Sequence, residues 1–233
     1  MNIMSAQKQP SLFGNLLLNI LIPTLILTKL STDQWLGPTW AVVAALAFPL
    51  AYGLYDLKQS GKVNFISILG VVSVLLTGGI SLLELDPKYL AIKEAAIPTL
   101  IGLALLISQF TSYPLLHKLL YNDQILSLAA IEQALSTEQQ QAELDKRLTI
   151  TSYLVASSFF LSGVLNYLLA RWIVVSLPGT SEFAAELGKM TALSYPVIMV
   201  PSMIVLIASL WYLLHSLKKL TGLDTDQLLA VKG

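Results

Sequence analysis

Apolar residues run in long blocks along this chain, and short polar breaks separate the blocks. Six blocks are close to the roughly 20 residues that a helix needs to cross a bilayer. They cover residues 12–30, 39–57, 64–85, 89–109, 150–177 and 193–215. Backbone groups in lipid must pair within their own segment, and no block alternates as a membrane strand would. The pattern predicts an all-α integral membrane protein: a single domain, 1–233, of six transmembrane helices arranged as hairpins.

The longest polar stretch covers residues 111–149 and separates the fourth block from the fifth. Apolar residues recur there three to four positions apart, as on one face of a helix: Ile125, Leu128, Ile131 and Leu135. Ser136 and Gln139 fit a capping box, which predicts a helix that runs through Arg147 into the fifth block. We interpret the stretch as a cytoplasmic amphipathic connector on the membrane surface. The alternative is a docking site for a cytoplasmic partner.

Composition supports the membrane interpretation and excludes several function classes. Hydrophobic residues make up 55% of the chain and charged residues 12%, against about a quarter in soluble domains. The formal net charge is zero, so nothing suggests a nucleic acid partner. The chain has no cysteine and no nucleophile, zinc or dinucleotide motif, and His117 and His215 stand alone. We therefore expect no enzyme activity, cofactor or metal site. Membrane lipids are the expected surroundings, and the sequence leaves monomer and homodimer open.

The distribution of lysine and arginine predicts the orientation of the helices. If the N-terminus is cytoplasmic, nine of the 14 Lys and Arg residues fall on cytoplasmic segments and five on outer loops. Positive residues are enriched on the cytoplasmic side of membrane proteins. We therefore expect both termini in the cytoplasm.

A weak internal similarity relates the third and fourth blocks to the fifth and sixth. Leu76-Thr77-Gly78 aligns with Leu161-Ser162-Gly163, and Pro98 aligns with Pro196. The alignment predicts a parallel repeat of two helical hairpins, an arrangement found in some transporters. Chance matching among small and apolar residues is the alternative.

Charged residues at the start of two blocks are the first candidates for a site. Lys93 and Glu94 lie in the first turns of the fourth block, and Lys189 precedes the sixth. Charges in a membrane are costly and often functional. The two lysines could line one outward-facing pocket, with Glu84 and Asp86 as their counter-ions. The alternative is that both lysines extend their ammonium groups to the membrane interface.

Polar residues also follow single faces of three predicted helices. Asn15 and Asn19 are four positions apart on the first, Thr77 belongs to a stripe on the third, and Ser162 and Asn166 belong to a stripe on the fifth. Such residues ordinarily mediate helix packing in membranes. Alternatively, the third and fifth helices enclose a polar cavity. The candidate polar pocket consists of Lys93, Glu94, Lys189, Asn166, Thr77, Ser162, Asn15 and Asn19.

Several short motifs are similar to those of one family of bacterial inner-membrane proteins. They are Thr77-Gly78-Gly79, Lys93, Ser108-Gln109 with Pro114-Leu115-Leu116, Gly163 to Asn166, and Gly188-Lys189-Met190-Thr191-Ala192-Leu193. Over roughly residues 60–218 the chain resembles the intracellular septation protein A family, the YciB-like proteins. The first two blocks match poorly, and the loop 122–146 is longer than the family's connector. The resemblance implies the bacterial inner membrane and a role in envelope maintenance and division through membrane-protein partners.

Two functional hypotheses follow. The first, which the resemblance favours, is a non-enzymatic protein of the bacterial cell envelope that acts through contacts with other envelope proteins. The second is a small transporter or channel for an ion, metabolite or lipid, with a polar path between the third and fifth helices. A membrane enzyme that acts on lipid-linked substrates is a third hypothesis with less support, because only scattered acidic residues favour it.

Overall fold

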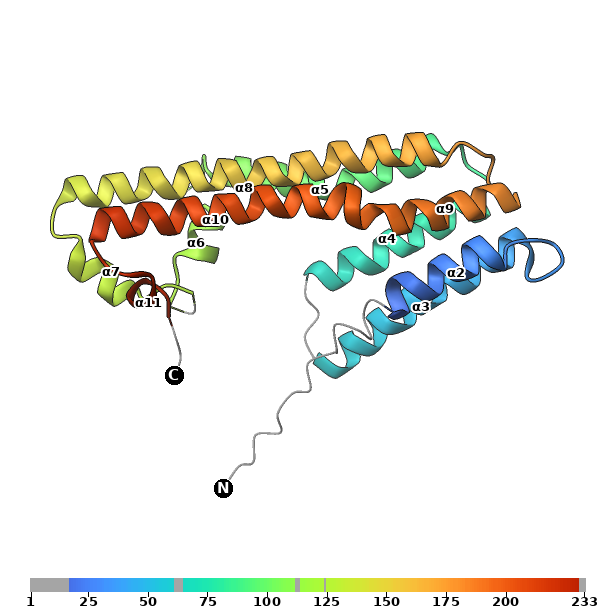
Figure 1. Cartoon of the computed structure of the whole chain (residues 1–233), viewed down its shortest axis with the longest axis horizontal. Coiled ribbons are helices and arrows are strands. Elements are labelled where there is room, and N and C mark those ends of the chain that lie inside the picture. The colour runs from blue at the N-terminus through green and yellow to red at the C-terminus, as the bar shows by residue number, and fades with distance from the viewer. Residues whose placement is uncertain (1–16, 61–64, 112–113, 124, 231–233) are drawn as a thin grey trace, which may run out of the picture. The chain divides into compact units, whose positions relative to one another are not determined.

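The computed structural model describes residues 17–60, 65–111, 114–123 and 125–230. These residues form helices and no strand; their one β-type contact is an isolated bridge between Leu126 and Leu229. The all-α prediction is therefore confirmed. The helices, labelled along the chain in Figure 1, form two compact units. Unit 1 contains the described residues of Met1–Glu94 and Asn166–Tyr195, and unit 2 contains those of Ala95–Leu165 and Pro196–Gly233.

Four helical segments are long and apolar enough to cross a membrane, which indicates a multi-pass membrane protein. They are α3 (Gly37–Ser60, with the apolar part Gly37–Tyr55), α5 (Lys88–Ser108), α8 (Glu138–Ile173) and the segment Ser181–Thr221. The last consists of α9 (Ser181–Ser194), the π-helical turn η2 (Tyr195–Met199) and α10 (Val200–Thr221). These four segments correspond to four of the six predicted blocks.

The other two blocks form shorter helices. Block 64–85 contains α4 (Phe65–Leu82), whose described apolar part is Val71–Leu82. Block 12–30 contains the π-helical turn η1 (Leu17–Leu21) and α2 (Ile22–Lys29), and it begins outside the described residues. The polar stretch contains α6 (Leu115–Leu120) and α7 (Leu128–Ala134), and the last helix is α11 (Thr225–Leu228). The structure thus establishes four candidate spans and leaves the count of six a prediction.

The capping box at the start of α8 lies one residue later than predicted. The Gln140 amide donates to the Thr137 hydroxyl, and the Thr137 amide donates back to Gln140 Oε1, both at 3.2 Å. The prediction of Ser136 and Gln139 was therefore wrong by one position, because Gln140 Oε1 accepts from the amides of both Ser136 and Thr137. From Glu138 the helix runs unbroken through Arg147 for 36 residues, as predicted. Its length of about 54 Å exceeds the ~30 Å hydrocarbon core, so its polar first turns extend beyond the lipid.

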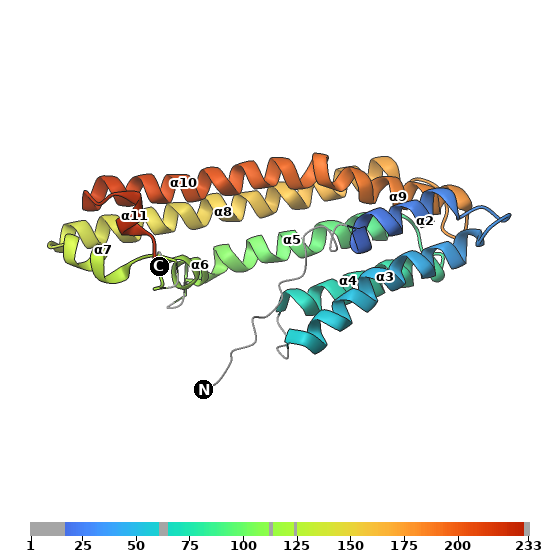
Figure 2. The same cartoon turned by 60° about the horizontal axis from the view of Figure 1, so that its bottom comes forward.

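In unit 1, α2 packs against α3 and α9, and α3 packs against α4 (Figures 1 and 2). Gly188 permits the close approach of α9 to α2. A Cβ atom at Gly188 would lie 2.9 Å from Leu27 Cβ, 2.9 Å from Thr28 Cγ2 and 3.2 Å from the Thr24 carbonyl. Two of these three atoms are backbone or directly attached to it, so they cannot swing aside. The glycine is therefore a steric requirement of this crossing.

The loops that join α2 to α3, α4 to α5 and α8 to α9 meet at one end of unit 1. Ser31 Oγ donates to the Ser181 carbonyl at 3.5 Å, and a Cβ at Gly179 would lie 2.9 Å from Glu84 Oε1. Four exposed aromatic residues surround this end: Trp35, Trp40, Tyr89 and Trp172. Tryptophan and tyrosine are enriched where membrane proteins pass from hydrocarbon to water. This end of unit 1 therefore has the character of a membrane interface.

Unit 2 has a compact apolar core at the end where α7 and α11 lie (Figure 2). Its members come from the connector, the first half of α8, the second half of α10 and α11: Leu126, Ile131, Leu135, Leu144, Leu148, Leu213, Leu217 and Leu228. The Ser127 amide donates to the Leu228 carbonyl at 2.9 Å, and the Ala230 amide donates to the Ile125 carbonyl at 3.0 Å. The apolar face predicted around Ile131 thus packs against α8, α10 and α11.

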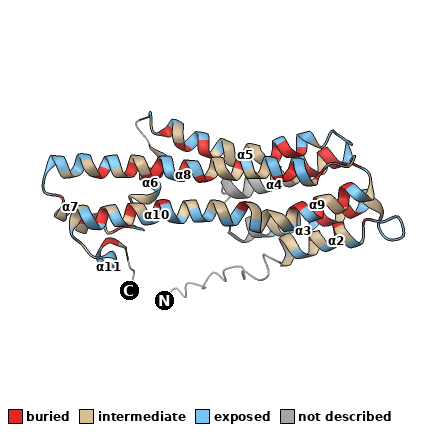
Figure 3. Ribbon diagram, turned by 45° about the horizontal axis from the view of Figure 1, so that its top comes forward, coloured by how far each residue is buried: buried red, intermediate tan, exposed pale blue. Residues whose placement is uncertain are grey.

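Large apolar side chains are exposed on the long helices, where Figure 3 shows many exposed positions. The exposed large side chains include Leu100 and Ile107 on α5, Val164 and Leu168 on α8, and Ile204, Ile207 and Trp211 on α10. Contiguous apolar surface of this extent is rare on soluble monomers. Contact with lipid tails avoids the unfavourable free energy of exposing these apolar faces to water.

We predict that Gly188→Ala lowers the stability of the protein by about 1–3 kcal/mol, because the added methyl group overpacks the crossing of α2 and α9. The expected effect on the purified protein in detergent is a fall in Tm of roughly 2–10 °C. Gly79→Ala is the matched control, since a Cβ there meets nothing within 4 Å. Equal Tm values for the two variants would contradict the role given to Gly188.

Leu228→Ala is expected to open the core of unit 2, since this side chain is fully buried there. Leu-to-Ala changes in cores cost about 2–5 kcal/mol. Hydrogen exchange should therefore accelerate at the Ser127 and Ala230 amides, which hold α11 against the connector. Leu119→Ala is the control, because Leu119 is 60% exposed. Unchanged exchange in Leu228→Ala would show that α11 contributes nothing to this core.

Candidate functional site

Lys93 lies in the second turn of α5, four residues after the interfacial Tyr89 and hence about 6 Å further along the helix. Its side chain is only 7% exposed. The ammonium group donates to Thr77 Oγ1 at 2.8 Å and to Glu94 Oε1 at 2.6 Å. For Lys93, extension of the ammonium group to the interface is therefore contradicted. The lysine is folded into unit 1 and paired there.

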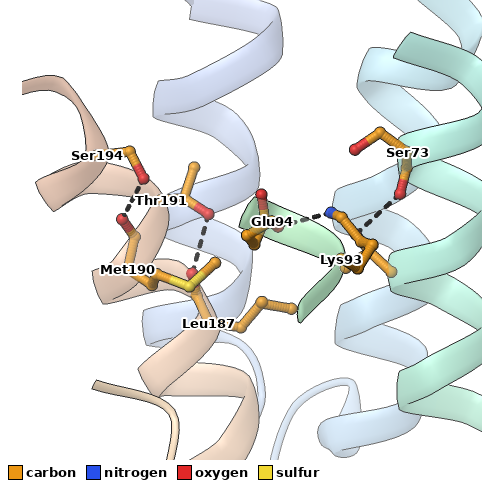
Figure 4. Close-up of polar contacts among 8 residues, drawn as sticks. Ser73, Lys93, Glu94, Leu187, Met190, Thr191 and Ser194 are labelled. Carbon is orange, nitrogen blue, oxygen red and sulfur yellow. Dashed lines mark hydrogen bonds and ion pairs between the residues drawn. The ribbon is translucent and has the colours of Figure 1, made fainter. Parts of the chain in front are cut away.

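Glu94 is the counter-ion of Lys93 and is 24% exposed. Neighbouring residues on a helix point about 100° apart, so they do not usually face each other. Here both side chains turn toward the same space between α4 and α9 (Figure 4). Only Oε1 of the carboxylate is engaged by Lys93. The ion pair thus lies at the wall of a cavity and not in solid packing.

Thr77 connects the ion pair to α4. Its hydroxyl donates to the Ser73 carbonyl at 3.0 Å and accepts from the Lys93 ammonium group. The hydroxyl proton is therefore already donated, and the oxygen positions Lys93 Nζ. The adjacent Gly78 faces Leu46 of α3, with 3.3 Å between an added Cβ and Leu46 Cδ1, which keeps α3 and α4 close.

The ion pair opens onto a cavity of about 300 Å³ that lies wholly within unit 1. Side chains from η1, α2, α3, α4, α5, α9 and η2 surround it. The apolar wall includes Ile20, Pro23, Leu27, Ala45, Leu46, Pro49, Val74, Leu187 and Met190, and the polar residues are Ser73, Thr77, Lys93, Glu94, Thr191, Ser194 and Tyr195. Its volume is at the lower end of the range for small-molecule sites.

Thr191 and Ser194 supply the polar groups on the α9 side of the cavity. The Thr191 hydroxyl donates to the Leu187 carbonyl at 2.9 Å, and the Ser194 hydroxyl donates to the Met190 carbonyl at 2.8 Å (Figure 4). Each hydroxyl has one proton, and in both cases the helix backbone uses it. In this arrangement both oxygens are left to accept a hydrogen bond from a solute.

The structure brings three of the predicted site residues together: Lys93, Glu94 and Thr77. Lys189 is exposed on α9 and is not among the described lining residues. Ser162 and Asn166 are half-buried on α8, which contributes no described residue to the cavity wall. Asn15 lies outside the described residues, and so does the side chain of Asn19. The cavity therefore lies beside α4, as predicted, but its described wall is completed by α9 and not by α8.

The ion pair of Lys93 is with Glu94, and not with either of the counter-ions that we expected for it. Asp86 lies 3.3 Å from Lys88 Nζ in an exposed pair, and the Lys88 backbone amide, followed by its side chain, lowers the pKa of Asp86. Glu84 has a positive φ of 51° in the same loop, where its carboxylate lies against Gly179. The interpretation of Glu84 and Asp86 as partners of Lys93 was wrong, because the adjacent Glu94 reaches the ammonium group first.

Sequence reasoning missed Ser194 and Tyr195 and named Thr191 only as part of a family motif. Their signal is a spacing of three to four residues from Leu187 to Tyr195, which places them on one face of α9. Among the described residues of the cavity wall, Glu94 supplies a single carboxylate. Among the described residues, no group of three or more His, Cys, Asp and Glu side chains could hold a metal ion.

No protein-family model, curated protein or solved structure matches this chain.

The Lys93–Glu94 pair should behave as a coupled unit in stability measurements. Glu94→Gln leaves a buried ammonium group without a counter-ion, which costs about 3–5 kcal/mol. Lys93→Met should cost less, because Glu94 retains contact with the cavity. The double variant Lys93→Met/Glu94→Gln should be more stable than Glu94→Gln alone, since no charge remains to be neutralised.

The measurement is the Tm of the four proteins in detergent. Lys88→Met is the control for loss of a lysine on the same helix, and it should change Tm little, because the Lys88–Asp86 pair is half-exposed. Strictly additive effects of the two substitutions would show that Lys93 and Glu94 are not coupled.

Proposed function

We propose that this protein binds a small polar solute in the cavity of unit 1 and carries it across the membrane, as a transporter or channel. The observation that supports the proposal is the Lys93–Glu94 ion pair at the wall of this cavity. Burying an ion pair costs several kcal/mol per ion, and apolar side chains of similar volume usually serve packing better. Ionisable residues within membrane helices ordinarily mark a site or a pathway.

The size of the cavity limits the class of solute. About 300 Å³ has room for a small metabolite but not for a lipid molecule with its acyl chains. Of an ion, a metabolite and a lipid, the three solutes considered for a transporter or channel, a small metabolite fits the cavity best. No covalent step is needed for this function, and we retain the expectation of a non-enzymatic protein without a cofactor.

The proposed arrangement in the membrane has six spans with both termini in the cytoplasm. The helical segments in blocks 12–30 and 64–85 supply the fifth and sixth spans beyond the four established ones. We also retain the parallel repeat of the hairpins that contain α4 with α5 and α8 with α10. The membrane is the bacterial inner membrane, as the resemblance to the YciB-like proteins suggests.

Envelope maintenance or division through partner proteins is the second proposed function. It is favoured by the packing of the connector: α7 of the connector and α11 share one apolar core with α8 and α10, and so form a cap on unit 2. A folded cap offers a defined surface to an envelope protein or to a second copy of the chain. This function and solute transport are compatible, because they use different parts of the chain.

Uptake into vesicles tests the transport proposal. Purified protein in phosphatidylethanolamine and phosphatidylglycerol vesicles is supplied with radiolabelled alanine, glycerol, lactate or methylguanidinium, which represent a zwitterion, a neutral solute, an anion and a cation. At least one solute should enter faster than into protein-free vesicles. Lys93→Met/Glu94→Gln should reduce this rate about tenfold or more, since each charge-assisted hydrogen bond is worth about 1.5–3 kcal/mol.

Lys189→Met is the matched control, because this lysine is exposed and absent from the described cavity wall. It should leave the rate unchanged. Uptake that equals that of protein-free vesicles for all four solutes, or full uptake by the double variant, would contradict transport through this cavity.

A further inference from the structure

The hydrogen-bonding groups around the cavity are unequal in number: acceptors outnumber donors. Thr191 and Ser194 present oxygens whose protons are already donated to Leu187 and Met190. Glu94 adds a carboxylate of which Lys93 engages only Oε1. The donors are fewer: the Lys93 ammonium group, two of whose three N–H bonds go to Thr77 and Glu94, and the hydroxyl groups of Ser73 and Tyr195, which can also accept. A solute that brings N–H donors satisfies this wall, whereas an anion would meet the Glu94 carboxylate.

We infer that the cavity is a binding site for a small organic cation that carries N–H donors, an ammonium or guanidinium group, and that Lys93 competes with this solute for Glu94. The inference rests on the proposed function and names its class of solute. The solute's N–H groups donate to Glu94, Thr191 and Ser194. Its carbon atoms contact the apolar wall near Leu187 and Met190.

Two further features of the cavity agree with this class of ligand. Tyr195 lines the cavity and adds an aromatic ring of the kind that attracts cations. The single carboxylate is too few for a divalent metal such as Mg²⁺ or Ca²⁺, which takes six or more oxygen ligands. The volume is also several times that of a water molecule, so an organic cation fills the space better than a bare ion.

Lys93 then has the role of a tethered cation. When no solute is present, its ammonium group neutralises Glu94 inside the low-dielectric unit. When the solute binds, Glu94 is shared by two positive charges, which weakens the binding. Removal of the Lys93 charge should therefore strengthen the binding of a cation, whereas it would abolish the binding of an anion.

The binding test uses full-length protein in detergent and isothermal titration calorimetry. The probes are propylammonium, propionate and 1-propanol, which differ in charge at equal carbon count, and tetramethylammonium, a cation without N–H donors. Propylammonium should bind the wild-type protein more tightly than the other three. Lys93→Met should tighten propylammonium binding about tenfold or more, equivalent to about 1.4 kcal/mol.

The matched variant pair is Lys93→Met and Lys93→Met/Glu94→Gln, which differ only at Glu94. We expect the double variant to lose propylammonium binding. This comparison avoids the Glu94→Gln single variant, which is expected to be destabilised. Propionate binding that disappears in Lys93→Met would overturn the cation assignment. Equal binding of 1-propanol or tetramethylammonium would overturn the role of N–H donors. Absence of propylammonium binding in both wild type and Lys93→Met would overturn the assignment of the cavity to a cation.

These outcomes are separable from failure of the proposed function. If lactate or glycerol enters vesicles in a Lys93- and Glu94-dependent way but propylammonium does not bind, transport stands and the cation class falls. If no solute enters but propylammonium binds with the expected variant pattern, the cation site stands and transport falls.

Discussion

A polar group that leaves water is destabilised unless it finds a partner inside the protein, and this constraint shapes the helices of both units. Their outer faces carry apolar side chains, so hydroxyl groups within the helices cannot rely on solvent. Many described serines and threonines donate instead to a carbonyl three or four residues earlier, as Ser152 does to Leu148 and Ser209 to Val205. A backbone carbonyl does not neutralise the charge of the Lys93 ammonium group, and the preceding turn of its helix, residues 89–92, has no carboxylate. Its ammonium group depends on Glu94 and Thr77, and all three residues line the cavity.

The same constraint separates two uses of polar side chains. Ser158 on α8 is buried and donates to the Val155 carbonyl, so it contributes to packing without presenting a free proton. Thr191 makes a similar bond but lies at the cavity wall, where its oxygen retains a lone pair toward the open space. The surroundings of each side chain, and not its residue type, decide which of them can meet a solute.

Hydropathy predicted the helices well, because a long apolar run has few alternatives in lipid. The apolar parts of α3, α5, α8 and the segment that contains α10 follow the predicted blocks. Local pairing was less predictable. The capping box at α8 shifted by one residue because Gln139 and Gln140 are both suitable partners, and only the backbone geometry selects Gln140. The counter-ion of Lys93 was missed because adjacent helical residues normally diverge, whereas these two long side chains converge on one cavity. The contribution of α9 depends on its crossing with α2 at Gly188, a contact between segments about 160 residues apart in the chain.

The packing of α11 has a consequence for the order in which the chain folds during synthesis. Leu228 completes the core that buries Ile131 of α7, yet about 90 residues separate Ala134 from Thr225. At 5–20 residues per second, the ribosome needs on the order of 5–20 s to make that interval. During this time α8, α9 and α10 emerge while the apolar face of α7 lacks its last partner. A chaperone or the membrane surface must cover that face until α11 arrives, so the interval is the period in which the nascent chain is most exposed to aggregation.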